Sequence, residues 1–341
     1  MSLISKIKKN LVNIPGWSTS RKLLVIESDD WGSIATPNLK TYNNLIDKGL
    51  PLDKSYFAKY DSLESEEDLH HLFEVLRSVK DKNNNPACLT ACSVVANPDF
   101  EKIKASNLKE YHFESSELTY KRFSHTENSF HLIKQGINER VYYPQLHGRE
   151  HLNPIEWLKQ IQSNPLEKLA FDYNTLPVLA NPMSSERKLG YLSAFDYDEE
   201  QEFSNFENVL NDAARLFKSQ FNYNSISFIA PTSVRSERMN IYLKNIGIKF
   251  HQSGNFVTPQ NEGYKTKQYH WGYKNKEKQI HWRRNVRFEP SLDFSDKWVG
   301  QALNDIEVAF RWGKPAVISS HRVNYIGSVD EKNRKNGLKN L

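Results

Sequence analysis

Short apolar runs alternate with stretches in which apolar residues recur at helical spacing, and this alternation continues along most of the chain. A run of four to eight apolar residues bounded by turn residues is typical of a buried strand, and apolar residues three and four apart indicate an amphipathic helix. We expect strands at residues 21–26, 87–95, 226–229, 248–252, 282–288 and 316–319 and one that begins at Val141, and helices at 65–79, 203–220, 236–246 and 296–312.

Local signals support several of these boundaries. Ser65 is a plausible cap for the helix at 65–79, and Asn153, Pro154 and Glu156 predict a helix start, with a cap, a proline in the first turn and an acid. Asn97–Pro98 is expected to open a further helix. Strands that alternate with helices favour a parallel sheet with crossover helices.

We expect a single catalytic domain over residues 1–341, with a core at about 20–325. Barrels of alternating strands and helices often form one unit of this size. Two stretches, at about 100–140 and 165–200, interrupt the alternation and are expected to be insertions. The second contains Pro177, Pro182 and Gly190, so we expect a turn-rich segment that could cover a cleft.

Composition and charge narrow the function classes. The chain has 46 basic and 41 acidic residues, a net charge of +5 without a long basic block, so we do not expect nucleic-acid binding. Cys88 and Cys92 lie four apart in one expected strand, which keeps the thiols too far apart to bridge, and both are predicted to be small buried hydrophobic residues. Aromatic residues make up 12% of the chain, enough to supply stacking faces for sugar rings.

No stretch has the length and apolar character of a secretory signal or a membrane span, so a cytoplasmic location is expected. Residues 3–12 could form a short basic amphipathic helix. Contact of this segment with the surface of the inner membrane is the alternative to its packing as an ordinary terminal helix.

Four distant apolar runs end in residues that can bind a metal or work beside one, or in a proline. In a barrel of this kind, loops at the carboxyl ends of the strands converge on one cleft, so these residues are expected to meet there. They are Asp29 and Asp30, His147 and His151, Pro231, and His321.

The residue types suggest which side chains could bind a metal and which could accept a proton. Of two adjacent carboxylates, Asp29 and Asp30, one can hold a cation while the other accepts a proton, although a plain turn with Asp30 as a cap is the alternative. His147 and His151, four apart, fit one side of a helical turn or tight loop, and two His with one Asp suit a zinc-class ion and leave positions open.

Two further residues, Glu150 and His321, could also take part in the site. Glu150, inside the histidine motif, is expected to orient a ligand or face solvent rather than bind the ion. His321 would end the last strand, beside the first, and is either structural or a general acid.

These motifs, in this order, resemble those of the NodB-like polysaccharide deacetylases, carbohydrate esterases of family four, over roughly residues 20–325. The resemblance implies an irregular (β/α)7-type barrel, with Asp29 as catalytic base and His321 as general acid. It implies Asp30, His147 and His151 as metal ligands. Gly148 stands where serine or threonine is usual in the family.

Two family motifs are altered in this chain. The third usually has an arginine close before a proline to support the catalytic aspartate, and residues 228–231 lack it. An arginine from elsewhere would have to substitute, and the fourth motif, an Asp and a Trp that support the acid histidine, is not clear in RNVRFEPSLDF. The candidate substitutes are Arg235, Arg283, Arg284 and Arg287.

The resemblance implies a metal-dependent deacetylase that hydrolyses N- or O-acetyl groups with Zn²⁺, or with Co²⁺ or another transition metal. Its expected partner is an acetylated saccharide, a nucleotide-linked or lipid-linked precursor of a surface glycan. Two alternatives stay open: a catalytically weakened glycan-binding protein on the same fold, and a metal-dependent hydrolase of another amide or of a glycosidic bond.

Overall fold

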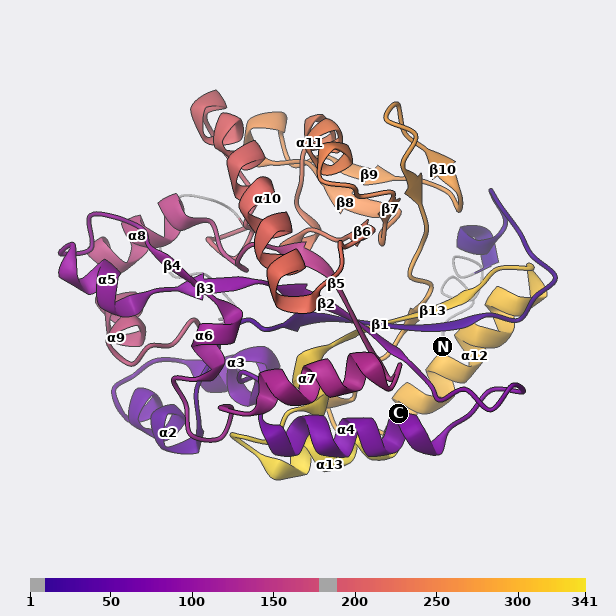
Figure 1. Ribbon diagram of the computed structural model, residues 1–341, viewed down its shortest axis with the longest axis horizontal. Helices are drawn as coiled ribbons and strands as arrows, with labels where there is room; N and C mark the ends of the chain where they lie inside the picture. Colours follow the sequence, from indigo (N-terminus) through magenta and orange to yellow (C-terminus); the bar gives the residue numbers. More distant parts are fainter. Residues whose placement is uncertain (1–9, 178–188) are drawn as a thin grey trace.

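A curled nine-stranded sheet forms the centre of the molecule in a computed structural model that describes residues 10–177 and 189–341 (Figure 1). The strand order is β10-β11-β7-β6-β5-β2-β1-β13-β12, and all neighbours are parallel except β10 and β11. The strands are β1 (Leu24–Trp31), β2 (Leu89–Val94), β5 (Tyr142–Gly148), β6 (Ser227–Phe228), β7 (Phe250–His251), β10 (Tyr273–Lys274), β11 (Ile280–His281), β12 (Val286–Arg287) and β13 (Ala316–His321).

Within the described ranges, β10 and β12 end the sheet and do not pair with each other. The sheet is therefore an incomplete barrel, which confirms the predicted irregular α/β barrel. Two small antiparallel pairs lie outside it: β3 (Ala96–Pro98) with β4 (Phe113–Ser115), and β8 (Asn255–Val257) with β9 (Thr266–Gln268).

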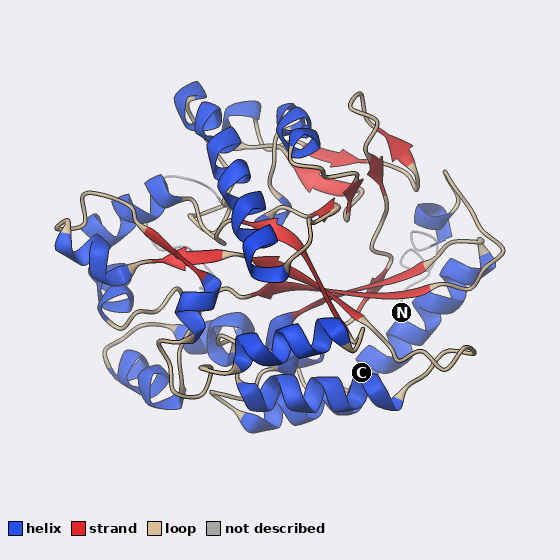
Figure 2. Ribbon diagram, viewed as in Figure 1, coloured by secondary structure: helices blue, strands red, loops and turns tan. Residues whose placement is uncertain are grey.

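Amphipathic helices cover the outer face of the sheet, as the layers in Figure 2 show. The face of α4 that packs against α7 and the core is apolar, with Leu69, Leu72 and Leu76 almost fully buried. Burial of such a face supplies most of the stability of a helix in a protein. The covering helices are α4 (Glu66–Ser78), α7 (Ser129–Asn138), α10 (Glu200–Phe221), α11 (Asn240–Asn245), α12 (Lys297–Arg311) and α13 (Glu331–Asn340).

Shorter helices gather near the carboxyl ends of the central strands, at the left of Figure 1. Two apolar clusters separate from the main core lie among them, one around Trp157 and Phe171 and the other around Leu45 and Leu52. These helices are α2 (Leu39–Asp47), α3 (Tyr56–Tyr60), α5 (Phe100–Ala105), α6 (Ser116–Tyr120), α8 (Pro154–Ser163) and α9 (Pro165–Asp172).

Helices with strong local signals are confirmed. Ser65 and Asp68 form a capping box at the start of α4, and Asn153 caps α8 with Pro154 in its first turn. The helices expected at 203–220 and 296–312 are α10 and α12.

Three expectations are corrected. Asn97–Pro98 lies in β3, and the next helix begins only at Phe100 because the Asp99 side chain accepts a hydrogen bond from the Lys102 amide and caps it there. The stretch at 100–140 contains α7, which packs on β5 within the connection from β2 to β5, so it is not wholly an insertion. The helix expected at 236–246 shortens to a 3₁₀ turn followed by α11.

Part of the stretch at 165–200 folds as α9, and residues 178–188 lie outside the described residues, as do residues 1–9 of the N-terminal segment. Both cysteines are free. Cys92 is buried as expected, whereas Cys88 is exposed because it precedes the first residue of β2. Among the helices that the structure describes, none has the length and apolar character needed to cross a membrane.

Candidate metal centre and active site

An irregularity at the end of β1 brings two adjacent carboxylates into one cavity. Successive side chains of a regular strand point to opposite faces of the sheet. The register between β1 and β2 shifts between Ser28 and Trp31, and Asp30 has a left-handed backbone with φ 74°. Asp29 and Asp30 therefore line the same cavity. Aspartate tolerates this conformation better than most residues.

The two histidines come from a strand end and the loop that follows it, rather than from one helical turn. His147 lies near the end of β5, and His151 lies just before α8, with ring centroids 5.2 Å apart. Between them Gly148 has φ +143°, and a Cβ there would lie 3.2 Å from the Glu150 carbonyl oxygen. This backbone accounts for glycine where the family usually has serine or threonine.

Asp30, His147 and His151 form the group of potential metal ligands within the described part of the chain. The Asp30 Oδ1 atom lies 3.3 Å from His147 Nε2 and 3.1 Å from His151 Nε2. Two ligand atoms on a tetrahedral zinc ion lie roughly 3.3 Å apart, since each bond is about 2.0 Å long. The three residues therefore fit a zinc-class ion with at least one position left open.

The surroundings of His147 favour this use. Its Nδ1 lies 2.9 Å from the Ile229 carbonyl oxygen, an acceptor, so Nδ1 carries the proton and Nε2 keeps a lone pair for a metal. The ring is almost fully buried, which holds its orientation.

Arg284 forms a two-point ion pair with Asp29. Its two terminal nitrogens donate to the Asp29 oxygens at 2.5 and 2.8 Å, and its Nε donates to Glu27 at 2.6 Å. Burial alone would raise the pKa of Asp29, but the Arg284 guanidinium outweighs it and the pKa lies below its usual value. Of the candidate arginines, Arg284 therefore pairs with Asp29, while Arg235 is buried elsewhere and donates to the Asn240 side chain.

His321 lies beside Asp29 because β13 pairs with β1 in a register that sets these two residues opposite each other. Its Nδ1 lies 2.6 Å from Glu289 Oε1, and 29% of its side chain is exposed. Burial opposes the charged imidazolium, yet the Glu289 carboxylate raises the pKa of His321 to about 10.

Glu289 is a site residue that sequence reasoning missed. Its Oε1 lies beside His321 Nδ1, and its other oxygen accepts from the Asn324 side chain at 2.7 Å. One signal was available: Glu289 follows β12 by two residues, at the same end of the sheet as the other site residues.

Glu150 is neither a ligand support nor a solvent-facing residue. It is 3% exposed, and its two oxygens accept hydrogen bonds from Arg149 at 2.6 and 2.7 Å. A buried carboxylate needs such a partner, and the adjacent arginine provides it.

A cavity of about 290 Å³ at the carboxyl ends of the strands is lined by Asp29, Asp30, His147, His151 and His321. Asp61 also lines it and is bound by two nitrogens of Arg322 at 2.8 and 3.1 Å. A cavity lined by both polar and apolar side chains can bind a small, partly polar group. The apolar lining consists of Ile34, Phe57, Leu176, Leu192 and Ala230.

No family model matches this chain, and its sequence matches no curated protein. Ten solved chains resemble it loosely in structure. A Mycobacterium smegmatis protein classed as a polysaccharide deacetylase is 10% identical, with a TM-score of 0.41 over 94% of this chain and 85% of that one. A 4-alpha-glucanotransferase from Thermococcus litoralis is 8% identical, with a TM-score of 0.38 over 93% of this chain and 36% of that one.

A polysaccharide deacetylase from Bacillus cereus is 11% identical, with a TM-score of 0.31 over 77% of this chain and 63% of that one. Likenesses at this level do not establish the activity of this chain. Its function has to be argued from its own residues.

Proposed function

We propose that this protein is a metal-dependent hydrolase that removes acetyl groups from a saccharide. One observation carries the proposal: a carboxylate, Asp29, and an imidazole, His321, lie opposite each other on neighbouring strands, in the same cavity as a three-ligand metal group. A base, an acid and a metal site in one small cavity are the parts that hydrolysis of an acetyl group needs.

Asp30, His147 and His151 would hold the ion. When bound there, a divalent transition metal lowers the pKa of water and polarises the acetyl carbonyl group. Asp29 accepts a proton as water forms a C–O bond to the carbonyl carbon. His321 donates its proton to the sugar nitrogen or oxygen as the bond from that atom to the carbonyl carbon breaks. The products are acetate and a free amine or hydroxyl group.

Both proton-transfer groups start in the required state near neutral pH. Arg284 keeps the pKa of Asp29 below its usual value, so the carboxylate is ionised and can accept a proton. Glu289 raises the pKa of His321 to about 10, so the imidazole is protonated and can donate one. Opposite pKa shifts in neighbouring groups are the pattern expected of an acid and base pair.

We extend the proposal to the identity of the substrate and of the metal. The substrate is an acetylated sugar, nucleotide-linked or lipid-linked, made for a surface glycan, and the metal is Zn²⁺ or a similar transition ion. The cavity of about 290 Å³ has room for an acetyl group and part of one sugar ring, and its lining includes apolar side chains.

The test is metal content followed by acetate release. We expect nearly one transition-metal ion per chain in protein purified without chelator, loss of that metal in a His147→Ala, His151→Ala double variant, and retention in the exposed control His131→Ala. Acetate release from acetylated sugars should follow the metal. Wild-type protein that binds no metal even after reconstitution would overturn the proposal.

A further inference from the structure

A second and larger cavity lies at the opposite end of the barrel from the metal group. Its volume is about 680 Å³, within the range of small-molecule sites. Val25 of β1 and Val317 of β13 line it, whereas Asp29 and His321, four residues further along the same strands, line the active-site cavity. The two cavities therefore occupy the amino and carboxyl ends of one barrel interior.

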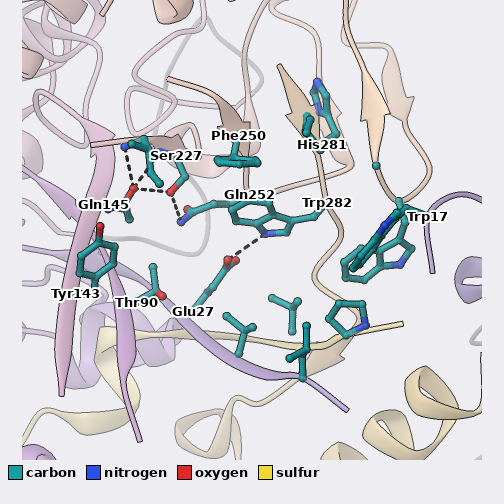
Figure 3. A pocket seen from close by; sticks show the side chains of 18 of the residues that line it. Trp17, Glu27, Thr90, Tyr143, Gln145, Ser227, Phe250, Gln252, His281 and Trp282 are labelled. Carbon is teal, nitrogen blue, oxygen red and sulfur yellow. Dashed lines mark hydrogen bonds between the residues drawn. The ribbon is translucent and has the colours of Figure 1, made fainter. Parts of the chain in front are cut away.

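The interior of this barrel contains a cavity, whereas side chains usually fill the interior of an α/β barrel. Proteins pack to nearly crystalline density, and the centre of a regular α/β barrel is filled by layers of side chains. Here β12 and β10 do not pair, and Figure 3 shows side chains arranged around the space between the strands. Three large apolar side chains at the cavity stay exposed: Trp17 (54%), Tyr143 (41%) and Ile226 (39%).

Several polar groups on the inner wall are paired with neighbouring side chains (Figure 3). Gln145 Oε1 accepts from the Ser227 hydroxyl at 2.7 Å, and Gln252 donates to the same hydroxyl at 3.0 Å. Glu27 accepts from Trp282 Nε1 at 3.0 Å and from Arg284 at 2.6 Å. A ligand in this cavity meets carbon on most sides. Two buried nitrogens of lining residues, Trp271 Nε1 and His281 Nε2, have no hydrogen-bond partner among the described residues.

Among the described residues that line the cavity, a charge without an ion pair belongs to an exposed side chain. Lys274 of β10 lines the cavity and is exposed, with no ion pair among the described residues. Its ammonium group can attract an anion at the mouth while a chain occupies the apolar interior. These two features together describe a ligand with a hydrocarbon tail and an anionic head.

We propose that this cavity binds a free, single-chain anionic amphiphile, such as a long-chain fatty acid, with the chain inside the barrel and the head at Lys274. The proposal does not depend on the acetyl-hydrolase activity. It concerns a different end of the fold and different residues.

The probe is cis-parinaric acid, a fluorescent fatty acid, titrated into the full-length protein. We expect saturable binding in the micromolar range. Val25→Trp in β1 and Ile226→Trp just before β6 place bulk in the cavity from two sides and should each weaken binding at least tenfold, while Val79→Trp at an exposed position away from the cavity should not. Circular dichroism and thermal melting check that each variant is folded.

The head group is tested separately. Lys274→Gln should weaken binding of the acid several-fold and leave binding of its methyl ester unchanged, whereas the exposed control Lys218→Gln should affect neither. Vesicles of phosphatidylcholine and phosphatidylglycerol distinguish a free chain from a membrane surface. Absence of saturable binding, unchanged binding in both folded tryptophan variants, or binding to vesicles without binding to the free acid would each overturn the proposal.

Discussion

At the scale of single residues, the site depends on two charged side chains that set the protonation of two others. Arg284 pairs with Asp29, and Glu289 pairs with His321. In each case the supporting residue lies in the segment at 282–289, and the supported residue lies on the neighbouring β1 or β13. The roles proposed for Asp29 and His321 can therefore be tested directly and through their partners.

Asp29→Asn should retain metal and lose acetate release by at least about a hundredfold, because an amide cannot accept the proton and general-base catalysis contributes roughly 10²–10⁴. Elemental analysis and an acetate assay measure the two effects. The exposed control Asp47→Asn should change neither. Loss of the metal in Asp29→Asn would mean that Asp29, rather than Asp30, is the ligand.

Glu289→Gln should move the alkaline limb of the pH–rate profile to lower pH. The Glu289 carboxylate raises the pKa of His321, so its removal lowers that pKa toward the ordinary value of histidine. A general acid must be protonated, and activity is therefore lost as pH rises through its pKa. A profile with an unshifted alkaline limb would exclude His321 as the acid.

At the scale of elements, strand irregularities place the proposed ligands. The left-handed backbone of Asp30 ends the regular pairing of β1, and Gly148 does the same for β5, where the register shifts between Ser93 and Val94. Bulges are common beside active sites because they redirect a side chain. Here they turn the carboxylate and the His151 loop toward each other.

Gly148→Ala should destabilise the protein by about 1–3 kcal/mol and weaken metal binding, because alanine strains a backbone with φ +143° and its Cβ would lie close to the Glu150 carbonyl oxygen. Thermal unfolding and metal titration measure the two effects. Gly300→Ala is the control: a Cβ there meets nothing within 4 Å in α12, so it should be neutral or stabilising. Equal metal affinity in the two variants would contradict this role of the loop.

At the scale of the whole molecule, an open barrel carries cavities at both ends of its strands. The layer between them contains Glu27, Arg284 and Asp29 and joins β1 to the segment that connects β11 and β12. This ionic layer therefore links β1 to a segment that joins the two sides of the incomplete sheet.

Arg284→Met should lower the free energy of unfolding by roughly 3–5 kcal/mol, because it leaves buried carboxylates without a cation. It should also abolish acetate release. Arg311→Met, at an exposed position on α12, is the matched control and should have little effect on either. Denaturant unfolding monitored by tryptophan fluorescence measures the stability. Wild-type stability in Arg284→Met would show that the ionic layer does not hold the barrel together.

The sequence alone determined the features that depend on residues close together in the chain. Residues only a few positions apart determine the caps of α4 and α8 and the apolar faces of α10 and α12. These helices form where expected. The alternation of apolar runs and helices likewise indicated an α/β barrel. The residue types at the strand ends pointed to a metal group before any distance was known.

The tertiary structure decided what depends on distant partners. Strands of two residues such as β10 and β11 are too short to leave a pattern, and the choice of Arg284 and Glu289 follows from which strands pair. Left-handed backbone at Asp30 and the cavity at the amino end also arise from sheet register and from the unpaired sheet edges. Register and pairing are set by contacts between residues far apart in the chain, and the pattern of a single sequence does not record which of them meet.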